Sequence, residues 1–168
     1  MLFMKGSAMD KEQFTQQVLA AEQTLYRVAK SMLMNEADCE DAVQDAVIAA
    51  YTHLERLQNP AYFKTWLIRI LINGCKKRLR QAKRTCALEE WMPLEQNTVL
   101  SDLEVQMAVE GLPSKIRLTV VLYYVEGYSV QKIGTMLKIP TGTVKSRLSK
   151  ARKALKMELE VRNVYEMG

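Results

Sequence analysis

The 168-residue sequence is poor in the residues that interrupt helices, with only four Pro and seven Gly. Strands and the turns between them use more Gly, Pro and β-branched residues than this. The abundant Leu, Ala, Glu, Lys, Arg and Gln instead favour helices. We therefore predict an all-α fold. Because compact helical modules of about 60 to 80 residues are near the lower limit for an independent core, the chain has room for one or two domains.

Cysteine is also scarce and histidine almost absent. Cys39, Cys75 and Cys86 are odd in number and lack the spacing of zinc ligands or of a disulfide framework. We expect no metal, no cofactor and a reducing, cytoplasmic setting. The sequence has no signal-peptide core, and no apolar run approaches the roughly 18 residues that span a bilayer, so we expect no membrane insertion.

Charge is arranged in blocks along the chain. Residues 31–55 contain acids but no Lys or Arg, and residues 64–84 contain bases but no acid. Residues 85–114 are again acidic without a base, and residues 141–157 are basic without an acid. A single block of one charge is as typical of a solvent-exposed helix face as of a binding surface. Two acid-free basic blocks, in a chain of net charge +5, favour a nucleic acid as the partner.

These blocks and the turn signals between them divide the chain into five parts. We predict two small helical domains joined by a flexible acidic linker. In chain order the parts are an N-terminus expected to be disordered (1–9), a first domain (10–84), the linker (85–100), a second domain (101–160) and a tail (161–168).

The first domain contains an amphipathic helix around Cys39 to Leu57. Its apolar residues recur at helical spacing: Val43, Ala46, Val47, Ala50 and Leu54. The opposite face carries Glu40, Asp41, Gln44 and Asp45. Acids near the start of a helix also suit its dipole, so a purely structural role stays open.

After a turn at Gln58-Asn59-Pro60, the apolar residues of a second helix are Phe63, Trp66, Leu67, Ile70 and Leu71. Its polar residues share one face: Arg69, Asn73, Lys76, Lys77, Arg80 and Arg84. Cations on this face would neutralise phosphates, and the Asn amide can read a base edge. Phe63 and Trp66 are the type of residue that stacks on unpaired bases, but their place on the apolar stripe favours core packing.

The second domain shows a helix-turn-helix pattern. An apolar helix from Ile116 to Val125 stops at Gly127. A short helix follows, with Ser129 as N-cap and an inner face of Val130, Ile133 and Leu137. Gly134 would allow a neighbouring helix to approach closely. Lys138-Ile139-Pro140 ends this short helix, and a new helix begins around Thr141.

This last helix separates core residues from candidate groove residues. Val144, Leu148, Ala151 and Leu155 face the core. The residues that point most directly away are Ser146, Ser149, Lys150 and Lys153, with Lys145 and Arg152 on one flank. At its start, the hydroxyls of Thr141 and Thr143 could bind phosphate, or could simply cap the helix.

With these residues in place, the sequence resembles the extracytoplasmic-function sigma factors, the smallest group of bacterial sigma factors. DCEDAVQDAVIAAY (38–51) is similar to the helix that binds core polymerase in that family. NPAYFKTWLIRILINGCKKRLR (59–80) is similar to its minus-ten-reading segment, and GYSVQKIGTMLKIPTGTVKSRLSKARKAL (127–155) to its minus-35-reading helix-turn-helix. Response regulators share strings like GTVKSRL, so the ordered presence of all three segments carries the resemblance.

The resemblance implies a non-enzymatic initiation factor. Its partners would be core RNA polymerase, through the clamp helices of the largest subunit and the flap, promoter DNA, and an anti-sigma factor. The implied polymerase-binding residues are Asp41, Gln44 and Asp45. The loop from Leu57 to Ala61 would capture flipped minus-ten bases, and the implied minus-ten set is Asn59, Ala61, Arg69, Asn73, Lys76, Lys77 and Arg80. The implied minus-35 set is Thr141, Thr143, Lys145, Ser146, Ser149, Lys150 and Lys153.

Two other functions stay open. A conventional helix-turn-helix regulator would bind duplex operator DNA without becoming a polymerase subunit, but it leaves the first domain without a role. A small helical enzyme would use His53 or a Cys as its catalyst. His53 is the only histidine, and the residues around it do not suggest a triad or a metal site.

Overall fold

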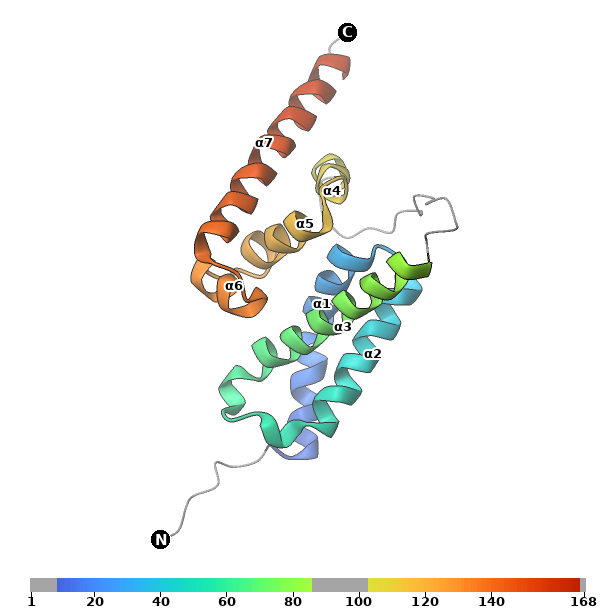
Figure 1. Cartoon of the computed structure of the whole chain (residues 1–168), viewed down its shortest axis with the longest axis vertical. Coiled ribbons are helices and arrows are strands. Elements are labelled where there is room, and N and C mark those ends of the chain that lie inside the picture. Colours follow the sequence, from blue (N-terminus) through green and yellow to red (C-terminus); the bar gives the residue numbers. More distant parts are fainter. Residues whose placement is uncertain (1–8, 86–102, 167–168) are drawn as a thin grey trace. The chain divides into compact units, whose positions relative to one another are not determined.

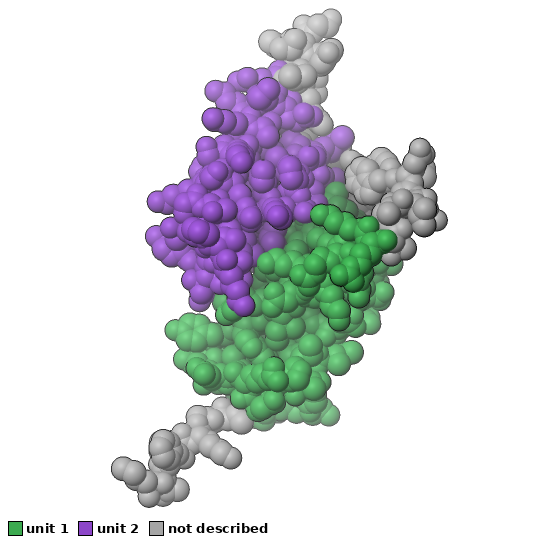
Figure 2. Space-filling view, viewed as in Figure 1, with its two compact units in different colours: residues 1–91 green, residues 92–168 purple. Residues whose placement is uncertain are grey.

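The computed structural model describes residues 9–85 and 103–166. Within these ranges every regular element is a helix, and the chain forms two compact units, residues 1–91 and 92–168 (Figure 2). The predicted all-α fold with two small domains is therefore confirmed. The expected N-terminal segment, except Met9, and the predicted linker, except Thr85, lie outside the described residues.

The first unit is a bundle of three helices, α1 (Lys11–Leu33), α2 (Glu36–Thr52) and α3 (Phe63–Thr85) (Figure 1). Each helix contacts the other two. α1 begins with a capping box, in which Asp10 accepts a hydrogen bond from the Gln13 backbone and the Gln13 side chain accepts one from the Asp10 backbone. α1 was not predicted from the sequence, although it is one of the three helices of the bundle.

The core side of α2 is shifted from the predicted stripe. Ala46 and Ala50 are buried as predicted, whereas Val43 and Val47 are only half-buried. Leu54 lies beyond the end of α2, in the short 3-10 turn η1 (Leu54–Arg56). The full set of buried residues on α2 is Cys39, Ala42, Ala46 and Ala50. These side chains are small, which lets α1 and α3 pack closely against this face.

α3 contributes the largest side chains to the core of the first unit. Phe63, Leu67 and Leu71 are buried as predicted, whereas Trp66 and Ile70 are half-buried. Ile68, Ile72 and Cys75 complete its buried face. Because Phe63 is only 1% exposed, it packs in the core rather than presenting a stacking surface.

The second unit consists of α4 (Leu103–Glu110), α5 (Ser114–Val120), the π-helical turn η4 (Val121–Val125), α6 (Val130–Leu137) and α7 (Thr141–Glu166) (Figure 1). The predicted helix from Ile116 to Val125 is thus α5 continued by η4. Ser129 accepts a hydrogen bond from the Lys132 backbone, as expected for an N-cap. α6 and α7 pack together as the predicted helix-turn-helix.

A buried arginine joins α4 to α5. The Arg117 guanidinium donates to the carbonyl oxygens of Glu110 at 2.9 Å and Leu112 at 2.7 Å, which lie at the end of α4 and in the turn after it. Burial lowers the pKa of Arg117, and the nearby Glu110 partly opposes this. Arg117 therefore satisfies carbonyl groups that the α4 helix leaves without intrahelical partners.

Candidate nucleic-acid and partner interfaces

The outer face of α2 carries the predicted polymerase-binding residues. Asp41, Gln44 and Asp45 are all exposed, and their spacing places them on one helix face. Ile48 continues this face one turn further and is 65% exposed. Ile48 was not predicted as a site residue, because an isoleucine inside a helix is usually assigned to the core. An apolar side chain among acidic ones is a combination suited to a protein partner.

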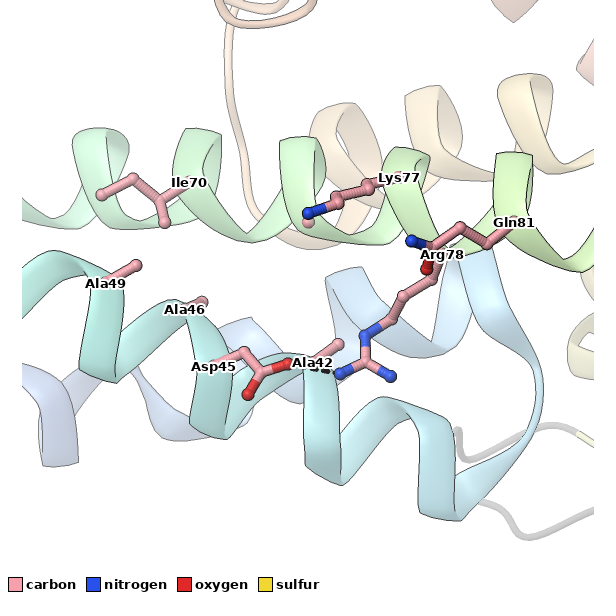
Figure 3. Close-up of a pocket in the computed structure, with 9 residues that line it drawn as sticks. Ala42, Asp45, Ala46, Ala49, Ile70, Lys77, Arg78 and Gln81 are labelled. Atoms are coloured by element: carbon pink, nitrogen blue, oxygen red, sulfur yellow. Dashed lines mark hydrogen bonds and ion pairs between the residues drawn. The ribbon is translucent and has the colours of Figure 1, made fainter.

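Asp45 is also held by a residue of α3. The Arg78 guanidinium donates to the Asp45 carboxylate across the two helices, and Figure 3 shows its side chain reaching from α3 toward α2. Both residues line a pocket between α2 and α3. The other residues that line this pocket are Ala42, Ala46 and Ala49 on α2 and Ile70, Gly74, Lys77 and Gln81 on α3. This ion pair could not be predicted from local sequence pattern, since its partners are 33 residues apart.

The segment between α2 and α3 is built from two short 3-10 turns, η1 and η2 (Pro60–Tyr62). The Asn59 side-chain oxygen accepts a hydrogen bond from the Ala61 backbone at 3.0 Å, which forms an Asx turn around Pro60. Asn59 and Ala61 are exposed, and Tyr62 is 58% exposed. This segment therefore presents backbone and side chains to a ligand, while Asn59 helps to fix its shape.

α3 begins directly after this segment and carries the predicted cationic face. Asn73, Lys76, Lys77 and Arg80 are exposed, and Arg69 is half-buried. No acidic residue occurs anywhere in α3. An anion near this face would meet several positive charges, with one neutral amide, that of Asn73, among them. This arrangement suits a nucleic-acid backbone with a base beside it.

The second unit presents a similar surface on α7. Val144, Leu148 and Ala151 are buried as predicted, and Leu155 is half-buried. The predicted groove residues are exposed: Lys145, Ser146, Ser149, Lys150 and Lys153. Arg147 is half-buried at the edge of the core. A helix with an apolar inner face and an outer face of Lys and Ser fits the recognition helix of a helix-turn-helix.

The turn between α6 and α7 depends on close backbone contact. A Cβ added at Gly134 would lie 3.0 Å from the Ile139 carbonyl oxygen. Lys138 ends α6 in the left-handed conformation, with φ of 55°. Thr141 is exposed and Thr143 half-buried at the start of α7. Gly134 therefore allows the close approach that the sequence predicted.

The described part of the chain contains two buried thiols and no group of metal-ligating side chains. Cys39 and Cys75 are fully buried, and burial raises the pKa of Cys39 to about 11 and that of Cys75 to about 12, which keeps both thiols protonated at neutral pH. The His53 Nδ1 atom lies 4.0 Å from the Glu55 Oε1 atom. Among the described residues no three His, Cys, Asp or Glu side chains are placed to hold a metal ion. No helix in these ranges is both long and apolar enough to span a bilayer.

Comparison with protein families gives two matches, one in each unit. Residues 18–85 match the family described as Sigma-70 region 2, and residues 102–155 match Sigma-70, region 4. The first range contains α2, the intervening segment and α3. The second contains the helix-turn-helix and most of the exposed face of α7.

Individual relatives give the same result. The chain is 36% identical to the ECF RNA polymerase sigma factor SigM of Mycobacterium tuberculosis, over 87% of this chain and 76% of that protein. It is 31% identical to the ECF RNA polymerase sigma factor SigW of Bacillus subtilis, over 89% and 90% of the two chains.

Two solved structures are also similar. The sigma factor RpoE, in a complex with the anti-sigma factor NepR from Bartonella quintana, has a TM-score of 0.78 and 25% identity, covering 89% of this chain and 98% of that one. CnrH, in a complex with the cytosolic domain of CnrY, has a TM-score of 0.66 and 25% identity, covering 90% of each chain.

Proposed function

Because the chain belongs to the extracytoplasmic-function sigma factors, which direct RNA polymerase in transcription initiation, we propose that its two units divide promoter recognition between them. The first unit binds core polymerase and captures unpaired minus-ten bases. The second reads duplex DNA at minus 35. Sigma factors are initiation factors rather than enzymes, so the work of this chain is selective binding.

The observation that carries this proposal is a pair of acid-free cationic helix faces, one in each unit, that differ in their surroundings. The face on α3 contains Asn73 and adjoins the exposed segment before the helix. The face on α7 belongs to a helix-turn-helix and carries serines between its lysines. The first suits a deformed or open strand, and the second suits the major groove.

Polymerase binding falls to the outer face of α2. Asp41, Gln44 and Asp45 offer carboxylate and amide groups to a basic partner, which the resemblance identifies as the clamp helices of the largest polymerase subunit. Exposed Ile48 adds apolar area to the same face. A charged surface with one apolar contact gives fast, oriented association as well as affinity.

Minus-ten capture falls to the segment Leu57–Ala61 and to α3. A base that leaves the DNA stack costs a few kcal/mol, which contacts in a preformed site can offset. Asn73 supplies both a donor and an acceptor for a base edge. The phosphates on either side of that base would be held by the cations of α3, Arg69, Lys76, Lys77 and Arg80. Asn59 and Ala61 would shape the site that the base enters.

Minus-35 reading falls to α7. Lys145, Ser146, Ser149 and Lys150 would meet base edges and nearby phosphates, and Lys153 would extend the phosphate contacts. Thr141 and Thr143 lie at the start of the helix, where free backbone amides favour an anion. Lysine at position 145 is a point charge that lacks the bidentate fork with which arginine reads guanine.

An anti-sigma factor completes the proposed set of partners. RpoE, which is similar over most of this chain, was solved with the anti-sigma factor NepR. We expect a protein of that kind to bind this chain and to compete with polymerase. The polymerase flap is the further contact expected for the second unit.

The test of minus-ten capture uses the reconstituted holoenzyme and Asn73→Ala. The control is Gln81→Ala, which removes another exposed amide from α3. We expect Asn73→Ala to slow open-complex formation by about tenfold, equivalent to about 1.4 kcal/mol, and to change closed-complex binding of duplex DNA little. Equal losses in both steps, or a loss no larger than that of Gln81→Ala, would contradict base capture.

A further inference from the structure

One aromatic ring of α1 contacts both ends of the segment that joins α2 to α3. The Phe14 ring lies 5.2 Å from the Tyr51 ring, with an angle of 66° between their planes. It lies 5.4 Å from the Phe63 ring, at an angle of 79°. Both are edge-to-face arrangements of the kind that aromatic pairs prefer. Tyr51 precedes the last residue of α2, and Phe63 is the first residue of α3, so Phe14 lies between the two ends.

The joining segment has little core of its own. Neither η1 nor η2 contains a buried residue. Inside the segment, the side-chain hydrogen bond from the Ala61 backbone to Asn59 shapes one turn. A segment with few buried contacts takes its conformation from the groups that fix its ends.

Phe14 itself is well fixed. It is 6% exposed and lies in the first turns of α1, directly after the capping box of Asp10 and Gln13. Met9 is 8% exposed, and the two residues occupy the positions of a hydrophobic staple before and after the N-cap. Phe63 in turn lies 6.1 Å from the Trp66 ring, so the aromatic row continues into α3.

We propose that Phe14 is a positioning residue for minus-ten capture, which holds the segment Leu57–Ala61 in its binding conformation by clamping Tyr51 and Phe63 together. The inference rests on the proposed function of that segment. A preformed segment loses less conformational entropy when it binds a base, and the affinity is correspondingly higher. Phe14 is 6% exposed, so it acts through the segment and not by direct contact with DNA.

The experiment measures binding of wild-type and variant holoenzymes to a fork-junction DNA selected by the wild-type holoenzyme from a random-sequence pool. Phe14→Leu keeps most of the volume but removes the ring. We expect it to weaken fork-junction binding by 5- to 20-fold and to change core-polymerase binding by less than about twofold. Phe14→Tyr keeps the ring and should restore most of the affinity.

A control variant separates positioning from a general loss of stability. Val28→Ala also shortens a buried side chain of α1, at a residue that is fully buried and is not one of the three rings. The unfolding midpoints of both variants are measured first, so that their fork-junction affinities are compared at a known loss of stability. A loss of fork-junction affinity in Phe14→Leu that is no greater than in Val28→Ala would overturn the inference.

Asn73→Ala distinguishes this inference from the function on which it depends. If Asn73→Ala binds the fork junction as well as wild type does, minus-ten capture by this face is itself wrong. If Asn73→Ala weakens binding while Phe14→Leu does not, capture stands and the positioning role of Phe14 is wrong. Losses in both variants, with rescue by Phe14→Tyr, would support both.

Discussion

Arg78 on α3 donates a hydrogen bond to Asp45 on α2, so a carboxylate assigned to polymerase binding already has a cationic partner within the chain. Asp45 keeps a side-chain exposure of 68%, and Arg78 is the less exposed of the two, at 31%. The carboxylate is therefore reachable from outside, but part of its charge is compensated. A basic surface on polymerase would compete with Arg78 for it.

Removal of Arg78 should strengthen polymerase binding. We expect Arg78→Ala to bind core polymerase about 2- to 5-fold more tightly, because a competing donor is lost. Exposed ion pairs contribute at most about 1 kcal/mol, so the free energy of unfolding should change little. Arg80→Ala removes the same charge from the same helix and serves as the control in a fluorescence titration without DNA. Weaker binding of Arg78→Ala than of Arg80→Ala would show that Arg78 assists polymerase binding.

Ile48 should be an apolar contact to polymerase. Ile48→Ser is expected to weaken core binding by roughly tenfold, about 1.4 kcal/mol, which is less than the full burial of an isoleucine contributes. Ile and Ser have similar helix propensities, so the folded state should be little affected. Leu19→Ser on α1 is the matched control, since Leu19 is 64% and Ile48 65% exposed. An equal effect of the two substitutions on core binding would contradict a specific contact at Ile48.

Lys150 should contribute a phosphate contact at minus 35. Loss of one phosphate contact reduces the slope of log K against log salt concentration by about 0.9. We expect this reduction for Lys150→Ala in holoenzyme binding to duplex minus-35 DNA. Lys156→Ala on the same helix should leave the slope unchanged, because its ammonium lies near Glu160, at 3.9 Å. An unchanged slope with reduced affinity for Lys150→Ala would instead indicate a base contact.

The turn of the helix-turn-helix should accept alanine less well at position 134 than at position 142. Gly134→Ala places a Cβ 3.0 Å from the Ile139 carbonyl oxygen. We expect the second unit to lose about 1 kcal/mol of stability, with weaker minus-35 binding. At Gly142 an added Cβ meets nothing within 4 Å, so Gly142→Ala should be neutral or stabilising by up to about 1 kcal/mol. Hydrogen exchange of the full chain measures the stability of the second unit in each variant. Equal protection of its backbone amides in the two variants would contradict the expected clash.

The buried thiols should make the first unit less stable at high pH. Burial raises the pKa of Cys39 to about 11 and of Cys75 to about 12, from 9.0. Above about pH 9 the unfolded chain therefore loses these protons first, and the free energy of unfolding falls as the pH rises. The loss should be about 1 to 2 kcal/mol per thiol between pH 8 and 10.5 in urea titrations. A Cys39→Ala/Cys75→Ala double variant should show a flatter profile, and equal profiles would argue against this origin.

The sequence predicted those features of the fold that depend on local pattern. The helix-turn-helix followed from Ser129, Pro140 and the apolar spacing of α7, because caps and periodicity are read over a few residues. α1 was missed, although Asp10 and Gln13 form a capping box and Phe14 begins an apolar stripe. The stripe of α2 was misplaced because the larger apolar residues Val43 and Val47 were assigned to the core, whereas the bundle buries the smaller Cys39 and Ala42.

The pairings between distant residues could not be predicted from pattern. Arg78 reaches Asp45 only because α2 and α3 lie side by side, and Phe14 meets Tyr51 and Phe63 only because all three helices form one bundle. The exposed state of Ile48 is likewise a result of tertiary packing. The cationic residues of α3 and α7 were predicted from charge and spacing, whereas the polymerase-binding role of α2 and the roles of Asn59 and Ala61 came from the family resemblance. All of these individual roles stay predictions.

The central claim is that this chain directs RNA polymerase to specific promoters through its two units. Run-off transcription with purified core polymerase, this chain and a genomic fragment library tests it most directly. We predict defined start sites that are absent with core polymerase alone, that share two upstream sequence elements, and that weaken with Asn73→Ala and with Lys150→Ala. No start sites above the background of core polymerase alone, together with tight autonomous binding of the chain to duplex DNA, would contradict the claim.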